Sequence, residues 1–172
     1  MTQVLPPPTS WLDKYHGPDF QPLYTATVRV SGGDARHGRA SGVARSDDGN
    51  LDLRLRMPAN LGGDGEGTNP EQLFAASYAA CFHGALSLLA ARAHVTIPDA
   101  TVTTSITFGR DPVDGLFTLV ADIRISLPGV DRTVAEELVR NTERICPYTK
   151  MTRCGIECGV SLDSIACLDP ED

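Results

Sequence analysis

The sequence is short of positive charge and has no recognisable export signal. Fifteen Lys and Arg residues against 22 Asp and Glu residues give a formal net charge of -7. This balance argues against a nucleic-acid partner, whose phosphates need a basic face. Residues 1–24 contain no basic start followed by an apolar run, so we expect no secretory signal. With five cysteines, the chain is expected in the reducing cytoplasm, where thiols stay free.

Charged residues are also absent from the long apolar stretch 73–91. Seven of its residues are Ala, and Ser77, His83, Gly84 and Ser87 interrupt it, whereas a lipid-facing helix would be richer in Leu, Ile and Phe. We therefore expect no membrane partner and interpret the stretch as a helix buried in protein on nearly all sides. One sheet covers only one side of such a helix, so the stretch favours a homodimer.

The order of the expected elements predicts one α+β domain over 24–163, with a Pro-rich extension at 1–23 and a tail at 164–172. Asn69 as N-cap and Pro70 at the first helical position start a helix that ends near Ala93. Thr133 and Glu136 form an expected capping box for a second helix, which Pro147 ends near Cys146. Alternating or turn-bounded segments predict strands over 24–30, 39–45, 51–57, 101–108, 117–127 and 155–162.

Two stretches carry the candidate chemistry: "NPEQLFAASYAACF" at 69–82 and "CPYTKMTR" at 146–153. In this order, over about 24–162, the chain resembles the organic hydroperoxide resistance proteins of the OsmC/Ohr family. The resemblance implies antiparallel sheets packed around long central apolar helices in an intertwined dimer. It also implies a thiol peroxidase that reduces organic hydroperoxides without a cofactor or metal and is recycled by a dithiol, the dihydrolipoyl groups of lipoylated proteins.

The resemblance also assigns residues. It implies Cys81 as the peroxidatic cysteine, Cys146 as the resolving cysteine that forms a disulfide with it, and Glu71 and an arginine as their partners. Matching "RHGRA" to the family's R-x-G-R pattern places the arginine at Arg36, but a two-residue insertion after Gly33 leaves Arg39 as an alternative.

The chemistry of a thiol explains why these residues are needed. A thiol attacks peroxide as the thiolate, and burial in an apolar helix raises the pKa of Cys81 above the ordinary value of about 8.5. An arginine from elsewhere must then supply the cation, and Glu71 can hold its guanidinium. Glu71 precedes Cys81 by ten residues, roughly 15 Å of helix rise. Therefore either Glu71 and Arg36 reach Cys81 from the other subunit, or the helix is broken. The apolar helix and Met57–Pro58 are candidates to line a groove for an alkyl chain.

Other interpretations stay open. A lone Cys81 would more often be a core residue than a nucleophile, and a non-catalytic thiol redox sensor or binding protein on the same fold is the alternative function. A zinc site is disfavoured because the late cysteines lack a C-x2-C pair; these are Cys146, Cys154, Cys158 and Cys167. Cys158 alternates with apolar residues and is expected to be an inert core residue, while Cys154 and Cys167 have no assigned role.

Overall fold

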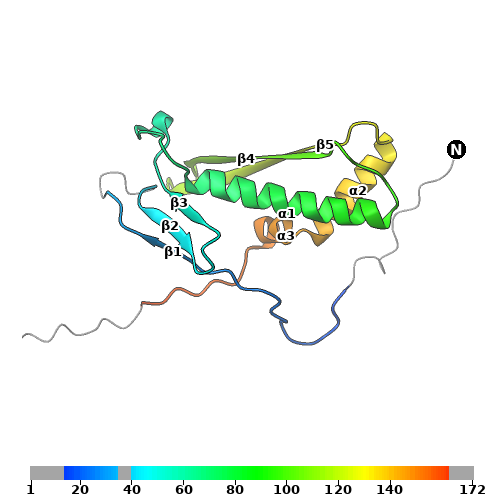
Figure 1. Ribbon diagram of the computed structural model, residues 1–172, viewed down its shortest axis with the longest axis horizontal. Coiled ribbons are helices and arrows are strands. Elements are labelled where there is room, and N and C mark those ends of the chain that lie inside the picture. Colours follow the sequence, from blue (N-terminus) through cyan, green and yellow to red (C-terminus); the bar gives the residue numbers. More distant parts are fainter. Residues whose placement is uncertain (1–13, 35–39, 163–172) are drawn as a thin grey trace, which may run out of the picture.

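The computed structural model describes residues 14–34 and 40–162. Its elements, in chain order, are β1 (Val28–Ser31), β2 (Val43–Ser46), β3 (Asp52–Arg54), the 3-10 turn η3 (Ala59–Leu61), α1 (Pro70–Arg92), β4 (Thr101–Arg110), β5 (Phe117–Ser126), α2 (Arg132–Ile145) and α3 (Pro147–Cys154). Helix α1 runs along the β4–β5 hairpin and also contacts α2 and α3 (Figure 1). This arrangement is the predicted α+β fold.

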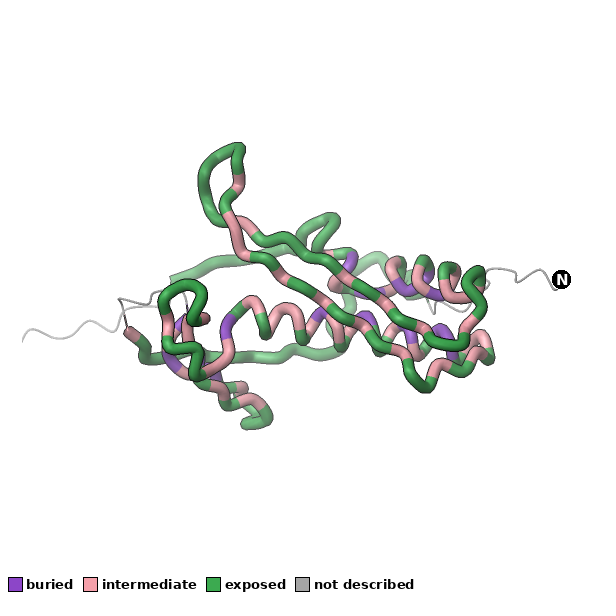
Figure 2. Tube along the Cα trace, turned by 90° about the horizontal axis from the view of Figure 1, so that it is seen from above, coloured by how far each residue is buried: buried purple, intermediate pink, exposed green. Residues whose placement is uncertain are grey.

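Both sheets are antiparallel, as predicted. Strands β1, β2 and β3 form a small meander, in which Ala44 lies between Val30 and Leu53. Strands β4 and β5 pair along their whole length, from Thr101 opposite Ser126 to Arg110 opposite Phe117. Along β4, half-buried and exposed residues alternate (Figure 2), and this period of two is the pattern from which the strand was predicted.

Helix α1 begins where the sequence predicts. The Asn69 side chain accepts a hydrogen bond of 2.8 Å from the Gln72 backbone N–H, and Pro70 occupies the first helical position. Its buried residues divide into two apolar clusters, one of which joins Leu86, Leu89 and Ala90 to Leu138 of α2. The other joins Tyr78 and Phe82 to Cys146. Full burial of each large side chain contributes about 1.5–3 kcal/mol.

One stripe of α1 remains exposed. It consists of residues three or four positions apart: Ala76, Ala80, Gly84, Leu88 and Ala91. By length and composition alone, α1 is a helix that could cross a membrane. Its opposite side, however, packs on α2 and the β4–β5 hairpin, as a core helix of a globular protein does.

The start of α2 corrects one prediction. The N-cap is Asp131 and not Thr133, because an Asp131 carboxylate oxygen accepts hydrogen bonds from the backbone N–H groups of Thr133, at 2.9 Å, and Val134, at 3.2 Å. Glu136, expected in a capping box, instead pairs with Arg132 at 2.7 Å on the exposed face. The Asp131 side chain thus already bonds the Thr133 N–H, which the Glu136 carboxylate would bind in the predicted capping box.

The structure beyond Cys146 also differs from the predictions. Pro147 ends α2 as predicted but also opens α3, which the sequence analysis did not anticipate. The expected strand 155–162 is irregular, and Ile156 and Val160 are 67% and 95% exposed. Cys158 is therefore exposed and does not belong to the core. Within the described part of the chain, no strand pairs with this segment, so its alternation has no sheet to join.

Candidate active site

The structure brings Cys81 and Cys146 together. Cys81 comes from the middle of α1 and Cys146 from the junction of α2 and α3, and the Cys146 thiol donates to the Cys81 sulfur over 3.7 Å. Cys146 is fully buried and Cys81 partly so. Sulfur atoms in a disulfide lie about 2.0 Å apart. The two thiols are therefore in contact, and a small movement would join them.

The surroundings of the pair are apolar. Tyr78 and Phe82 are buried beside Cys146, and Phe74, Ile123 and Tyr148 pack around them. This burial raises the pKa of the Cys81 thiol to about 11, and the hydrogen bond to Cys146 and the charge interaction with it add to the increase. A hydrogen bond from the Tyr148 backbone N–H acts in the opposite direction. The described surroundings of Cys81 thus favour the neutral thiol.

Cys146 occupies the ends of two helices. Its backbone N–H donates to the Thr142 carbonyl at 2.9 Å, and its own carbonyl accepts from the Lys150 N–H at 3.2 Å. The sequence predicted only the end of α2, whose dipole disfavours a thiolate. The start of α3 places the Tyr148 N–H against Cys81, so this helix end supports negative charge on the partner sulfur.

A pair of hydroxyl groups lies one helical turn from the sulfur pair. The buried Tyr78 hydroxyl donates to Thr149 Oγ1 at 3.2 Å and lies 3.3 Å from Thr152 Oγ1. The Tyr78 ring lies 6.1 Å from that of Phe74 and 5.7 Å from that of Tyr148. Sequence reasoning missed these residues, although Tyr78 precedes Cys81 by three positions and Thr149 follows Cys146 by three.

The other expected site residues do not join the cysteines within one chain. Glu71 lies in the first turn of α1, which is continuous from Pro70 to Arg92. This continuity excludes the broken-helix alternative and leaves Glu71 and Cys81 about 15 Å apart along the axis. Arg36 and Arg39 both lie outside the described residues.

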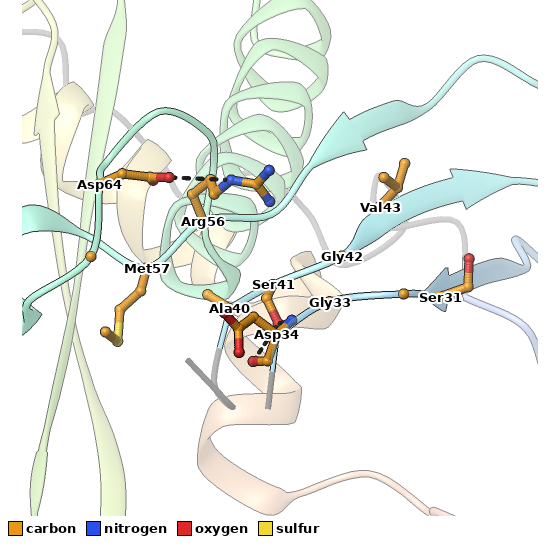
Figure 3. Close-up of a pocket in the computed structure, with 12 residues that line it drawn as sticks. Ser31, Gly33, Asp34, Ala40, Ser41, Gly42, Val43, Arg56, Met57 and Asp64 are labelled. Atoms are coloured by element: carbon orange, nitrogen blue, oxygen red, sulfur yellow. Dashed lines mark hydrogen bonds and ion pairs between the residues drawn. The ribbon is translucent and has the colours of Figure 1, made fainter. Parts of the chain in front are cut away.

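Two pockets bear on the predicted groove for an alkyl chain. One of about 460 Å³ is lined by Phe74, Tyr78, Leu119, Ala121, Ile123 and Thr152, and so shares three residues with the cysteine cluster. The other, of about 500 Å³, lies between the end of the β1–β2 hairpin and the Gly-rich loop 62–67, which contributes Gly63 and Asp64 (Figure 3). Met57 lines this second pocket beside the Arg56–Asp64 ion pair of 3.5 Å. Met57 and the helix residues near Cys81 therefore line separate pockets in one chain.

No cluster of three His, Cys, Asp or Glu side chains that could hold a metal occurs within 14–34 and 40–162. In those segments, the buried dithiol is the arrangement with evident redox chemistry. The fold and the site thus define an α+β protein with two cysteines in contact at the junction of three helices.

Comparison with known proteins identifies the family. The OsmC-like protein family matches residues 63–161. The organic hydroperoxide resistance protein of Xanthomonas axonopodis pv. citri (strain 306) is 42% identical over 142 residues, which cover 81% of this chain and 94% of that protein. The chain belongs to the OsmC/Ohr family, as its two motifs predicted.

Solved structures agree. The crystal structure of the organic hydroperoxide resistance protein OhrB of Bacillus subtilis matches with a TM-score of 0.65 and 41% identity, covering 77% of this chain and 93% of that one. An organic hydroperoxide resistance protein from Elizabethkingia anophelis matches with a TM-score of 0.69 and 36% identity, covering 80% and 94%. The predicted OsmC/Ohr fold is therefore confirmed.

Proposed function

We propose that this protein is a cysteine-based thiol peroxidase that reduces organic hydroperoxides to alcohols. The observation that carries the proposal is the 3.7 Å contact between Cys81 and Cys146 in a chain whose relatives are named for organic hydroperoxide resistance. The pocket next to the cysteine cluster is lined by Phe74, Leu119, Ala121 and Ile123 together with the hydroxyl-bearing Tyr78 and Thr152, which supports an organic substrate that carries one polar group.

The reaction proceeds in three balanced steps. The Cys81 thiolate attacks the terminal oxygen of the hydroperoxide, the O–O bond breaks, and the alkoxide leaves with a proton as alcohol, so Cys81 becomes a sulfenic acid. The Cys146 sulfur then attacks the Cys81 sulfur, the S–O bond breaks, and water leaves. An external dithiol, in our proposal a dihydrolipoyl group, reduces the resulting Cys81–Cys146 disulfide and is itself oxidised to a disulfide.

Arg36 and Glu71 complete the proposed site. The arginine supplies the cation that an apolar site needs to stabilise the thiolate, and Glu71 orients its guanidinium. Since Glu71 lies about 15 Å from Cys81 along an unbroken helix, we propose that both residues come from the partner subunit of a homodimer. We also propose that the protein acts in the cytoplasm, where dithiol reductants are available.

A peroxidase assay tests the proposal. We expect the purified protein to turn over cumene hydroperoxide faster than hydrogen peroxide, and to do so with dihydrolipoamide in preference to thioredoxin. Cys81→Ser should abolish turnover, and Cys146→Ser should abolish recycling through the disulfide. Cys154→Ser is the matched control because its thiol is exposed at the end of α3. Full turnover in Cys81→Ser would contradict the assignment.

The same assay separates the alternative function. A thiol redox sensor on this fold would form the Cys81–Cys146 disulfide once, in proportion to added hydroperoxide, and would show no sustained turnover with either reductant. The proximity of the two thiols favours turnover, because a resolving thiol in contact with the oxidised sulfur allows rapid recycling.

A further inference from the structure

We infer that Tyr78 is a positioning residue that holds Cys146 against Cys81. The inference rests on the proposed function, in which Cys146 resolves the oxidised Cys81. Tyr78 and Cys81 are three residues apart on α1, and Cys146 and Thr149 are three residues apart at the start of α3. Residues three apart lie on the same face of a helix. The Tyr78–Thr149 hydrogen bond and the Cys81–Cys146 contact therefore join the same face of α1 to the start of α3, one helical turn apart.

Helix α3 is attached through the Tyr148 ring, which packs on Phe74 and Tyr78, through the Arg153–Glu143 ion pair of 2.9 Å to α2, and through Thr149. It is eight residues long, and Thr149 is the residue of α3 that is buried. The hydroxyl of that residue is the one that accepts the Tyr78 hydrogen bond. The bond is itself buried, where an unpaired hydroxyl would be costly. The bond therefore adds to the contacts that hold the start of α3, and with it Cys146, against α1.

Counting protons identifies Tyr78 as the donor between α1 and α3. The Thr152 hydroxyl donates to the Thr149 carbonyl at 3.0 Å. Its single proton is thereby used, so toward both threonines the Tyr78 hydroxyl is the donor, with Thr149 Oγ1 the nearer acceptor. The 3.3 Å approach of Tyr78 to Thr152 reaches the same helix. Removing the Tyr78 hydroxyl loosens α3 on α1 without disturbing the bond inside α3.

This bond acts on the second chemical step. The two sulfur atoms must approach from 3.7 Å to about 2.0 Å for the disulfide to form. When α3 is held on α1, the Cys146 thiol stays at a high effective concentration near the Cys81 sulfur. When α3 is loosened, the oxidised Cys81 survives longer and meets a second hydroperoxide molecule, which oxidises the sulfenic acid to sulfinic acid.

Two measurements on the full-length protein test the inference. The first is the equilibrium between the dithiol and the disulfide in buffers of reduced and oxidised glutathione. The second is the ratio of sulfinic acid to disulfide at Cys81 after excess cumene hydroperoxide, determined by mass spectrometry. For Tyr78→Phe we expect the disulfide to be about two- to tenfold easier to reduce, the effect of one net hydrogen bond. The sulfinic acid fraction should increase by a similar factor.

Matched variants distinguish positioning from general stability. Thr142→Val also removes a buried hydroxyl, one that donates to the Leu138 carbonyl inside α2 at 2.7 Å, and it keeps the backbone carbonyl that accepts from the Cys146 N–H. It should leave both readouts unchanged. Thr149→Val should reproduce the Tyr78→Phe effect in part, and the double variant should be less than additive. If Tyr78→Phe fails to fold, Thr149→Val decides the question.

The experiment distinguishes a failure of the Tyr78 inference from a failure of the proposed peroxidase function. If the protein does not react with hydroperoxide, the proposed function fails, but the glutathione equilibrium still measures how α3 positions Cys146. If Tyr78→Phe and Thr149→Val lower stability no differently from Thr142→Val and leave the glutathione equilibrium at the wild-type value, the positioning role is overturned.

Discussion

At the scale of single residues, the environment of Cys81 is unfavourable to its own proposed chemistry. Burial raises the pKa of this thiol to about 11. At pH 7 only about one molecule in ten thousand would then hold the thiolate. The Tyr148 N–H lowers the pKa without cancelling the increase. The site therefore needs a nearby cation, which stabilises the thiolate and lowers the pKa.

Arg36 and Arg39 are the two candidates for this cation, and substitution distinguishes them. We expect Arg36→Ala to slow the reaction of Cys81 with cumene hydroperoxide by about ten- to a thousandfold, because a positioned charge shifts a pKa by one to three units. In this variant the thiolate should appear only as the pH rises toward 11. Rapid mixing gives the rate, and ultraviolet absorbance of the thiolate gives the titration.

Arg39→Ala is the matched control for this prediction. It removes the same charge from the same segment and should slow the reaction less. A larger loss in Arg39→Ala would show that the insertion after Gly33 shifts the catalytic arginine to the second position of the motif.

At the scale of elements, the sequence predicts those with strong local signals. Helix α1 has an N-cap, a proline at the first position and a long uncharged run, and the structure confirms its start. Half-buried and exposed residues alternate along most of β4, and along β5 they alternate from Asp122 to Ser126. Helix α3 was missed because Pro147 was interpreted only as a stop, although proline also suits the first position of a helix.

The candidate site was predictable to the same extent. The two motifs identified Cys81 and Cys146, and the structure places them in contact. The Tyr78–Thr149 bond was not predictable, because Thr149 reaches Tyr78 only through α3. Alternation in 155–162 predicted a strand, but a strand needs a neighbour to pair with, and local pattern does not supply one.

The cap of α2 gives a prediction at this scale. Asp131→Ala removes a side chain that accepts two backbone hydrogen bonds, so we expect a loss of about 1 kcal/mol in the free energy of unfolding. Thr133→Ala, at the position the sequence favoured, should cost less than half as much. Urea denaturation at one fixed protein concentration measures both. A larger loss for Thr133→Ala would restore the capping box.

At the scale of the whole molecule, the exposed stripe of α1 concerns assembly. An apolar stripe of this length, without charge, is typical of a surface that another protein surface covers. Leu88, which is 45% exposed, lies within it. We expect Leu88→Glu to weaken the proposed homodimer at least tenfold, because a carboxylate would lose its hydration in the interface.

Sedimentation velocity over a range of concentrations checks this prediction. Thr133→Glu, which adds the same charge at the exposed start of α2, should leave the association unchanged. If the wild-type protein sediments as a monomer at all concentrations, the stripe is not a self-association surface.

The last prediction joins the assembly to the chemistry. Cys81 and Cys146 meet within one chain, whereas Glu71 lies about 15 Å along the same unbroken helix. If the partner subunit supplies Glu71 and Arg36, two inactive variants should complement each other. One subunit carries Cys81→Ser; the other carries Arg36→Ala and Glu71→Ala. In their heterodimer, one site combines the intact Cys81 of the second subunit with the intact Arg36 and Glu71 of the first.

Random exchange of equal amounts of the two variants makes half of the dimers heterodimers, and each heterodimer has one working site out of two. About a quarter of the wild-type activity should therefore return. Each variant mixed with itself controls for the exchange conditions, and native mass spectrometry verifies that heterodimers form. Heterodimers without activity would place all the catalytic groups of each site in a single chain, and the arginine would then have to reach Cys81 without Glu71.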